Sequence, residues 1–146
     1  MKIKKKNIPR LYIPSELEGE FVNLDAESIH YIRNVLRLNA GRKVNLFNGK
    51  GQEKECIIEK LAHKEATLRI NKNLIPLKEP GIKITLIQGL PRSGVIDNII
   101  QKSTELGIYD IYPVFTQYSI IKIQADSAKK RLQHWEKISY GACEQS

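Results

Sequence analysis

The chain has 146 residues, of which 41% are hydrophobic, so it can bury the core of one ordinary domain or of two small ones. Its 24 Lys and Arg against 16 Asp and Glu leave a formal charge of +8. This favours a polyanionic partner such as nucleic acid or an anionic membrane surface, although a merely soluble basic surface explains the charge equally well. No apolar run approaches the roughly 20 residues that cross a bilayer, and no signal peptide is evident, so we expect a cytoplasmic protein.

Two strands and a helix are predicted at the start of the chain. Runs of β-type residues predict strands at 10–13 and 21–24. Asp25 is then the expected N-cap of a helix that ends near residues 39–41. The apolar residues at helical spacing in this segment are Ile29, Ile32 and Leu36, with Val35 beside them.

The pattern then changes to alternation, which predicts more strands. Asn48-Gly49 favours a hairpin with a type I′ turn, in which both central residues take positive φ. Strands around one early helix, within about 75 residues, predict a small barrel or curled sheet, which is an RNA-binding architecture among others. The expected strands are 44–47, 56–58 and 66–70.

Residues 74–81, which carry Pro76 and Pro80, have the composition of a linker, and α/β structure is predicted beyond them. We therefore place a first domain at 1–75 and a second at 76–146.

The second domain begins with residues 82–87, an almost continuous apolar run that predicts a strand covered on both faces. A helix is expected at 95–106, ended by Gly107 in the left-handed conformation, and a parallel strand at 108–115. With a single βαβ unit the domain looks unfinished, so we expect residues 82–146 to be poorly stable alone. A last helix near Asp126 places on one face Leu132, Trp135, Ile138 and Ala142.

Basic residues give the first candidate site. Arg33 and Arg37 lie four residues apart in the predicted helix, so they would share a face and bind neighbouring phosphates as a pair. A solvated helix face is the alternative. The candidate RNA contacts are Arg10, Arg33, Arg37, Arg42, Lys50, Arg92 and Lys102. Three aromatic residues among them can stack unpaired bases, although core packing is the favoured interpretation: Tyr12, Tyr31 and Phe47.

Polar residues of the second domain give another candidate site. Gln88 and Arg92 follow the first predicted strand, where ligands gather in open α/β sheets. Gln101, Lys102 and Glu105 lie on the next helix, where an ordinary solvated face is an equally good interpretation.

Metal and redox sites are not indicated. Cys56 and Cys143 have no CxxC spacing, and the scattered histidines have no ligand partners, so we expect reduced packing cysteines and no metal. The absence of GxGxxG and P-loop motifs argues against dinucleotide binding and NTP hydrolysis.

Several segments in order resemble the RsmE family of ribosomal RNA methyltransferases. Each is weak alone, but together they extend across nearly the whole chain. They are residues 8–12, 30–37, 46–49, 99–107, 135–138 and 142–146.

The resemblance implies a small PUA-like β-barrel that binds RNA, followed by the first part of a SPOUT-type, knotted α/β methyltransferase domain. Such enzymes transfer a methyl group from S-adenosylmethionine (SAM) to N3 of a uridine in 16S ribosomal RNA, typically as cytosolic homodimers. By position, Arg10, Arg33 and Arg37 would belong to the RNA-contacting surface. The candidates for the methyl-transfer region are Glu105, Glu144 and Gln145.

The sequence departs from the family pattern in one respect. The glycine-rich cofactor loop and the following leucine- and arginine-bearing segment, which form the knot, have no counterpart here. We therefore expect that this chain alone does not bind SAM and is inactive by itself, and its catalytic base is unassigned. The alternative is a stand-alone RNA-binding or ribosome-associated module without catalysis; a DNA-binding protein would need a helix-turn-helix spacing that is not found.

Overall fold

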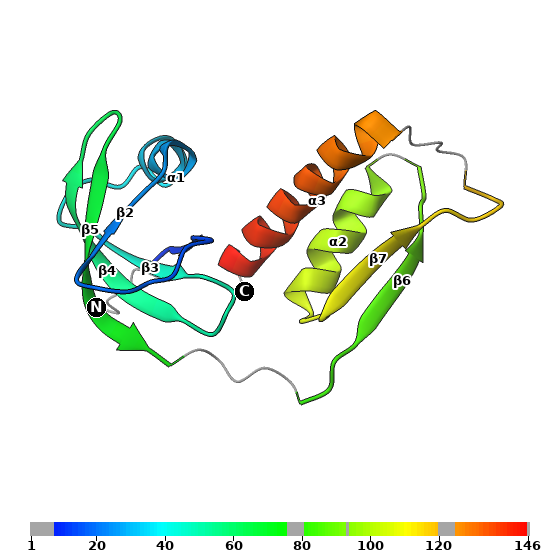
Figure 1. The fold of residues 1–146 in the computed structure, drawn as a ribbon, viewed down its shortest axis with the longest axis horizontal. Coiled ribbons are helices and arrows are strands. Elements are labelled where there is room, and N and C mark those ends of the chain that lie inside the picture. Colours follow the sequence, from blue (N-terminus) through cyan, green and yellow to red (C-terminus); the bar gives the residue numbers. More distant parts are fainter. Residues whose placement is uncertain (1–7, 76–80, 93, 120–124, 146) are drawn as a thin grey trace, which may run out of the picture. The chain divides into compact units, whose positions relative to one another are not determined.

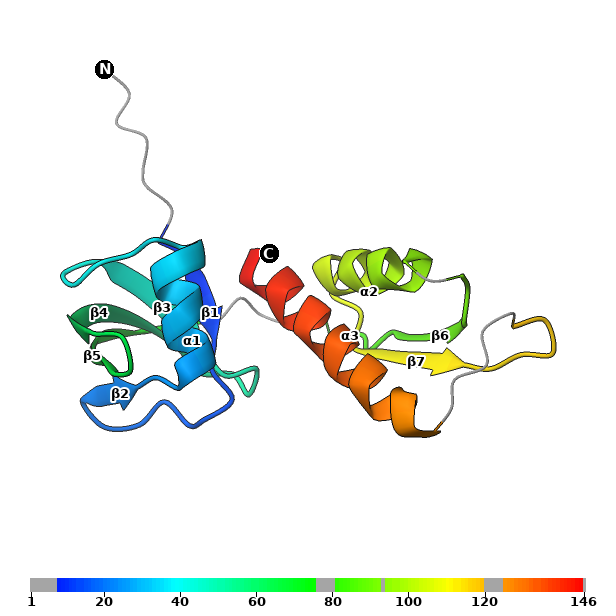
Figure 2. The same ribbon diagram turned by 90° about the horizontal axis from the view of Figure 1, so that it is seen from above.

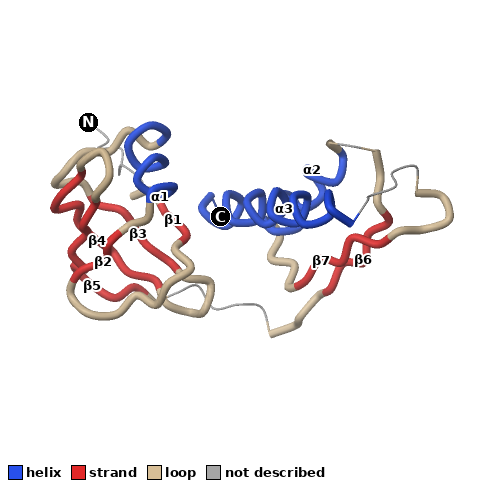
Figure 3. Tube along the Cα trace, turned by 45° about the horizontal axis from the view of Figure 1, so that its top comes forward, coloured by secondary structure: helices blue, strands red, loops and turns tan. Residues whose placement is uncertain are grey.

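The computed structural model describes residues 8–75, 81–92, 94–119 and 125–145, with the side chains of 125 and 126 excepted. The chain divides into two compact units, Met1–Leu77 (unit 1) and Lys78–Ser146 (unit 2). Strands dominate unit 1, whereas helices make up much of unit 2 (Figure 3). The two linker prolines, Pro76 and Pro80, lie outside the described residues.

Unit 1 is a five-stranded sheet in the order β1-β3-β4-β5-β2 (Figure 1). β1 runs parallel to β3, and the other neighbours are antiparallel. Among the described residues β1 and β2 are the two edges, so the pairing is that of an open sheet, which agrees with the curled sheet and not with the barrel among the two predicted forms. The strands are β1 (Arg10–Tyr12), β2 (Phe21–Asn23), β3 (Lys43–Phe47), β4 (Glu53–Leu61) and β5 (Ala66–Leu74).

The core of unit 1 joins the sheet to the helical segment. Leu46, Ile58 and Leu68, from three neighbouring strands, are fully buried and pack in one cluster with Ile29 and Ile32. The predicted strands of this unit are therefore confirmed, and so are Ile29, Ile32 and Leu36 of the helical segment as core residues, whereas Val35 is 57% exposed.

The helical segment differs from the prediction after its first turn. Helix α1 (Ala26–His30) begins as expected, because the Asp25 carboxylate accepts a hydrogen bond from the Ser28 N–H at 2.8 Å. A π-helical turn, η1 (Tyr31–Val35), follows, in which the Leu36 N–H bonds the carbonyl five residues back. The expected α-helical spacing to residues 39–41 is wrong, because the wider turn holds an extra residue and the helix ends earlier.

Arg37 lies outside this helix with φ of 51°. The left-handed conformation breaks the helical repeat at this residue. Arg33 and Arg37 therefore do not share a face of one α-helix, and their predicted i,i+4 pairing is wrong.

The hairpin between β3 and β4 is confirmed, but its turn type is not. Phe47 pairs with Glu53, so the loop spans 48–52. Gly49 and Gly51 have positive φ, whereas Asn48 does not. Asn48 acts through its side chain instead, because its Oδ1 accepts hydrogen bonds from the backbone N–H groups of Lys50 and Gln52.

Unit 2 is a βαβ unit followed by a long helix (Figure 2). The two strands are parallel as predicted, and Gly107 follows α2 with φ of 78°. The first strand begins at Thr85, three residues later than expected. The elements are β6 (Thr85–Gly89), α2 (Val95–Glu105), β7 (Asp110–Val114) and α3 (Ala125–Gln145).

The helices of unit 2 leave one face of the strand pair uncovered. Trp135 and Ile100 form the core between α3 and α2, and Ile111 of β7 packs against it. On the other face Ile87 and its register partner Tyr112 are 70% and 54% exposed. The expectation of a strand covered on both faces is therefore wrong for this unit, because both helices pack on the Ile111 side.

The packed face of α3 differs from the prediction at one residue. Trp135 and Ala142 are buried as predicted, but Leu132 is 52% exposed and does not belong to the packed face. No helix within the described ranges is both long and apolar enough to cross a bilayer.

Candidate functional site

Three of the predicted RNA contacts are engaged with carboxylates. Arg10 forms a two-pronged ion pair with Glu53, with N···O distances of 3.0 and 3.2 Å. Its guanidinium carbon also lies 4.5 Å from the centre of the Phe47 ring, a cation–π geometry. An arginine held on two sides has less freedom to turn toward a phosphate.

The other two engaged cations are lysines. Lys50 Nζ bonds Glu16 Oε1 at 2.9 Å, and this bond raises the pKa of Lys50 above its ordinary value. Lys102 Nζ bonds Glu105 Oε2 at 2.7 Å and in turn lowers the pKa of Glu105. An adjacent carboxylate therefore offsets the positive charge of each lysine.

The aromatic residues near these cations belong largely to the fold. Phe47 is only 8% exposed and meets the Tyr12 ring edge-on at a centroid distance of 5.7 Å. Tyr31 packs against the core cluster of unit 1. Phe47 is thus a core residue, as the favoured interpretation had it, while Tyr12 and Tyr31 are half-buried.

Three arginines, hereafter the exit arginines, differ from the engaged cations: Arg33, Arg37 and Arg42. Within the described part of the chain, none of them has a carboxylate partner within 4 Å. They lie on η1 and on the loop that leads from it to β3. In this segment no ion pair with a described carboxylate offsets the positive charge.

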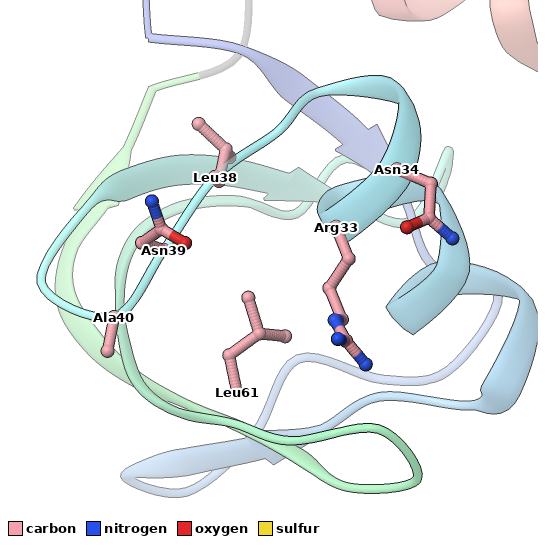
Figure 4. A pocket seen from close by; sticks show the side chains of 6 residues that line it. All are labelled: Arg33, Asn34, Leu38, Asn39, Ala40 and Leu61. Carbon is pink, nitrogen blue, oxygen red and sulfur yellow. The ribbon is translucent and has the colours of Figure 1, made fainter.

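A hollow of about 260 Å³, hereafter the exit pocket, lies beside this loop. Figure 4 shows Arg33 at one side, Asn39 at the other and Leu61 of β4 between them. Arg33 is oriented by a single long hydrogen bond, from its Nη1 to the Ala62 carbonyl at 3.4 Å. The lining side chains are those of Arg33, Asn34, Leu38, Asn39, Ala40 and Leu61.

Sequence reasoning missed the neutral half of this pocket. Asn39 is predicted only as part of a helix end, and Leu61 lies beyond the predicted strand 56–58. No local pattern brings these two residues together, because the loop after η1 is fixed to β4 by the hydrogen bond from Gly41 N–H to the Ile58 carbonyl, at 2.7 Å.

In unit 2 the structure separates the two predicted polar groups. Gln88 and Arg92 lie at the carboxyl ends of the strands, whereas Glu105 ends α2 near their amino ends, because residues 106–109 lead directly into β7. Glu144 and Gln145 end α3, at the same end as the close of α2 (Figures 1 and 2). The catalytic candidates are thus at the end of unit 2 opposite to the one where α/β ligands gather.

The hydrogen bonds of Glu105 also argue against a role as the catalytic base. Its carboxylate accepts hydrogen bonds from Lys102 and, at 3.0 Å, from Gln101. The lowered pKa makes it a weak proton acceptor, whereas a general base works best with a pKa near the operating pH.

One contact in unit 2 was not anticipated, whereas the packing role of Cys56 in unit 1 was predicted. Asp97 of α2 accepts hydrogen bonds from the Trp135 indole at 3.1 Å and lies 3.0 Å from His134 Nε2, which ties α2 to α3. Cys56 is fully buried, and burial raises the pKa of its thiol to about 11, so it is an inert packing residue. Over the described residues, His, Cys, Asp and Glu form no group of three that could hold a metal ion.

Comparisons with known proteins bear on both units. Residues 24–71 match the family model of an RNA methyltransferase PUA domain, and residues 78–146 match that of an RNA methyltransferase domain. The ribosomal RNA small subunit methyltransferase E of Buchnera aphidicola subsp. Schizaphis graminum is 32% identical over 142 residues, which is 97% of this chain and 58% of the relative. The enzyme of the same name from Bacillus subtilis is 30% identical over 88% of this chain and 50% of its own length.

Solved structures agree with these matches. The ribosomal RNA small subunit methyltransferase E of Neisseria gonorrhoeae, bound to S-adenosyl methionine, superposes with a TM-score of 0.89 at 34% identity, over 95% of this chain and 57% of that one. A Legionella pneumophila protein in complex with the bound cofactor SAM gives a TM-score of 0.90 at 32% identity, with coverage of 95% and 58%. The chain belongs to the ribosomal RNA small subunit methyltransferase E family. It spans about half the length of the curated relatives it matches.

Proposed function

We propose that this chain is the RNA-binding portion, with the start of the catalytic domain, of an enzyme that methylates N3 of a uridine in 16S ribosomal RNA. The observation that carries the proposal is the order of the two family domains, PUA and then methyltransferase, over residues 24–71 and 78–146. The unpaired exit arginines of unit 1 give the PUA domain a means of binding phosphates.

The same relationship supports the finer features of the proposal. The complete enzyme is a cytoplasmic homodimer, and its second domain adopts the knotted SPOUT fold. The uncovered Ile87 and Tyr112 face of unit 2 is compatible with a larger sheet domain, because parallel sheets are normally covered on both faces.

SAM is the methyl donor in this proposal, since relatives of the chain bind it. The described residues at the carboxyl ends of β6 and β7 do not fit the cofactor by themselves. Gln88 Nε2 bonds the Gly89 carbonyl at 2.8 Å, and the Leu90 N–H bonds the Val114 carbonyl at 3.0 Å, so these groups satisfy one another. We therefore propose that this chain alone is inactive.

The proposed RNA contacts divide into two groups by their partners. The exit arginines and the exposed Arg92 carry most of the contact, because no carboxylate in the described residues must be displaced. Arg10, Lys50 and Lys102 contribute less, since each is already paired.

RNA binding is tested through its salt dependence. Replacing Arg33 and Arg37 together with Gln removes two phosphate contacts and lowers the slope of log affinity against log salt by about 0.7 for each contact on single-stranded RNA. Fluorescence anisotropy with a small-subunit ribosomal RNA fragment measures that slope. The matched control is the double change of Lys129 and Lys130 to Gln, which removes the same charge from exposed sites on α3. Equal slopes for the two double variants would show that Arg33 and Arg37 do not contact the RNA.

Methyl transfer is tested with the same chain, methyl-labelled SAM and small-subunit ribosomal RNA. We expect no label in the RNA. Label on N3 of a uridine, seen as a block to reverse transcription because N3 lies on the pairing edge, would show that the chain contains a complete cofactor site. A stand-alone binding module is the second candidate, favoured by the mutually bonded strand ends; a reading frame that continues past Ser146 with a glycine-rich loop decides against it.

A further inference from the structure

The exit pocket has the size, charge and hydrogen-bonding groups of a site for one nucleotide. We propose that it binds a single unpaired RNA nucleotide, with the base inside the pocket and the phosphate on Arg33. This inference deepens the proposed function, because it rests on RNA binding by unit 1 and assigns that unit a base-contacting site.

The size of the pocket limits its occupant. Its volume of about 260 Å³ falls below the roughly 300–1,000 Å³ of pockets that enclose a drug-sized ligand. A complete SAM molecule exceeds it, whereas one planar base fits. RNA readout works on bases of this kind, because unpaired loops and bulges can extrude a single base toward a protein.

The charge of the pocket matches a nucleotide phosphate. Arg33 has one hydrogen bond in the described structure, the 3.4 Å bond to the Ala62 carbonyl, and this bond uses one of the five N–H donors of a guanidinium group. The remaining donors can form the paired bonds that guanidinium groups make with phosphate oxygens. No acidic side chain lines the pocket, so nothing in its lining repels an anion.

Two amide side chains supply the groups that a base edge requires. Asn34 and Asn39 each offer donor and acceptor atoms, which match the mixed donors and acceptors of a pairing edge. The Asn34 amide nitrogen lies 2.8 Å from His30 Nδ1, and this contact leaves its Oδ1 as an acceptor. Asn39 is exposed across the pocket from Arg33 (Figure 4), so polar side chains face the hollow from two sides. Leu38 and Leu61 pack against the core of unit 1 and form the floor between them.

The backbone around the pocket is formed before any ligand arrives. The π-turn and the left-handed Arg37 turn the chain out of the helix, and the Leu38 N–H bonds the Ile32 carbonyl at 3.0 Å. A non-glycine residue in this conformation is strained, and such residues concentrate at binding sites. Because the bond between Gly41 and Ile58 fixes the far side of the loop, the pocket does not have to be organised by the RNA.

The test compares two probes of equal charge and length: an oligouridylate and an abasic ribose-phosphate oligomer. At fixed salt, we expect the wild-type chain to bind the oligouridylate about tenfold more tightly, the effect of one well-made base contact. Asn39→Ala removes an amide, and Ala40→Phe fills the pocket with a ring. Both variants should lose that preference while they bind the abasic oligomer as the wild type does.

Controls and competitors make the outcomes distinct. Asn98→Ala repeats the amide deletion at an exposed site on α2 and should keep the preference. If Ala40→Phe fails to fold, Asn39→Ala still decides. Equal wild-type affinity for the two oligomers would overturn the inference. No salt-dependent binding of either oligomer would instead overturn the proposed function.

Discussion

Unit 1 and unit 2 bury their apolar residues in different ways. In unit 1, strands and helical segment enclose one core in which Ile58 is fully buried. In unit 2, two helices cover one face of a strand pair, and Ile87 on the other face is 70% exposed. An isoleucine in a β-strand therefore contributes much to the stability of unit 1, at Ile58, and little to that of unit 2, at Ile87.

The largest expected effect comes from Ile58→Thr in β4. The change removes buried hydrocarbon and places a hydroxyl in an apolar core, so it should cost about 2–4 kcal/mol of unit 1 stability. Urea unfolding followed by far-UV circular dichroism measures it. Trp135 is the single tryptophan and lies in unit 2, so its fluorescence follows that unit separately. An equal shift of the Trp135 transition would show that the two units unfold together.

A smaller effect is expected at Glu55, a buried carboxylate of the unit 1 sheet. Glu55 accepts hydrogen bonds from Lys43 at 2.9 Å and Asn71 at 2.7 Å, and the bond from Lys43 is the main cause of its lowered pKa. Glu55→Gln should therefore cost about 1–3 kcal/mol at neutral pH, since it leaves Lys43 without its charged partner.

The stabilisation by Glu55 should decrease as the pH falls. The folded-state pKa lies below the ordinary value of 4.5, so the contribution of Glu55 is present above 4.5 and is lost as the pH falls through the folded-state value. Wild type and Glu55→Gln should converge in acid, as measured by urea unfolding at several pH values. Glu59→Gln is the matched control, because this carboxylate on the same strand is exposed in its pair with Arg69. A difference that stays constant with pH would assign the effect to packing.

The contact between α2 and α3 in unit 2 should contribute less to stability than Glu55 does in unit 1. Asp97→Asn keeps an acceptor for the Trp135 indole but removes the negative charge that faces His134, so we expect a loss of about 0.5–1.5 kcal/mol. Trp135 fluorescence during urea unfolding measures it directly. The exposed Glu136→Gln on α3 removes the same charge without that contact and should leave the transition in place.

Local signals in the sequence were sufficient for much of the fold. The Asp25 cap, the glycine after α2 and the apolar runs each act over a few residues, and the structure confirms the elements they predicted. The failures need information from further along the chain. The π-turn before Arg37 and the five-residue loop after β3 depend on how those segments pack and bond in three dimensions.

In the candidate site, too, some features could be predicted from the sequence and others depend on the folded structure. Sequence charge located the basic residues, but it did not reveal that Glu53 pairs with Arg10 from 43 positions away. It also could not bring Asn39 to Leu61, because only the folded loop places them around one pocket. The sequence therefore identifies the basic residues of the site. It does not identify the carboxylates that pair with some of them and leave the others available for RNA.

The smallest expected effect completes the comparison of the two units. Ile87→Thr repeats the Ile58 substitution on the exposed face of β6, where the β-branched shape is kept and no buried contact is lost. Stability should change by less than about 0.5 kcal/mol, as for ordinary surface positions, when Trp135 fluorescence is followed in urea. Binding of an apolar dye should fall, because Ile87 and Tyr112 form part of an exposed apolar surface. A loss as large as that of Ile58→Thr would mean that the Ile87 face is covered in solution, and the contrast between the two units would then disappear.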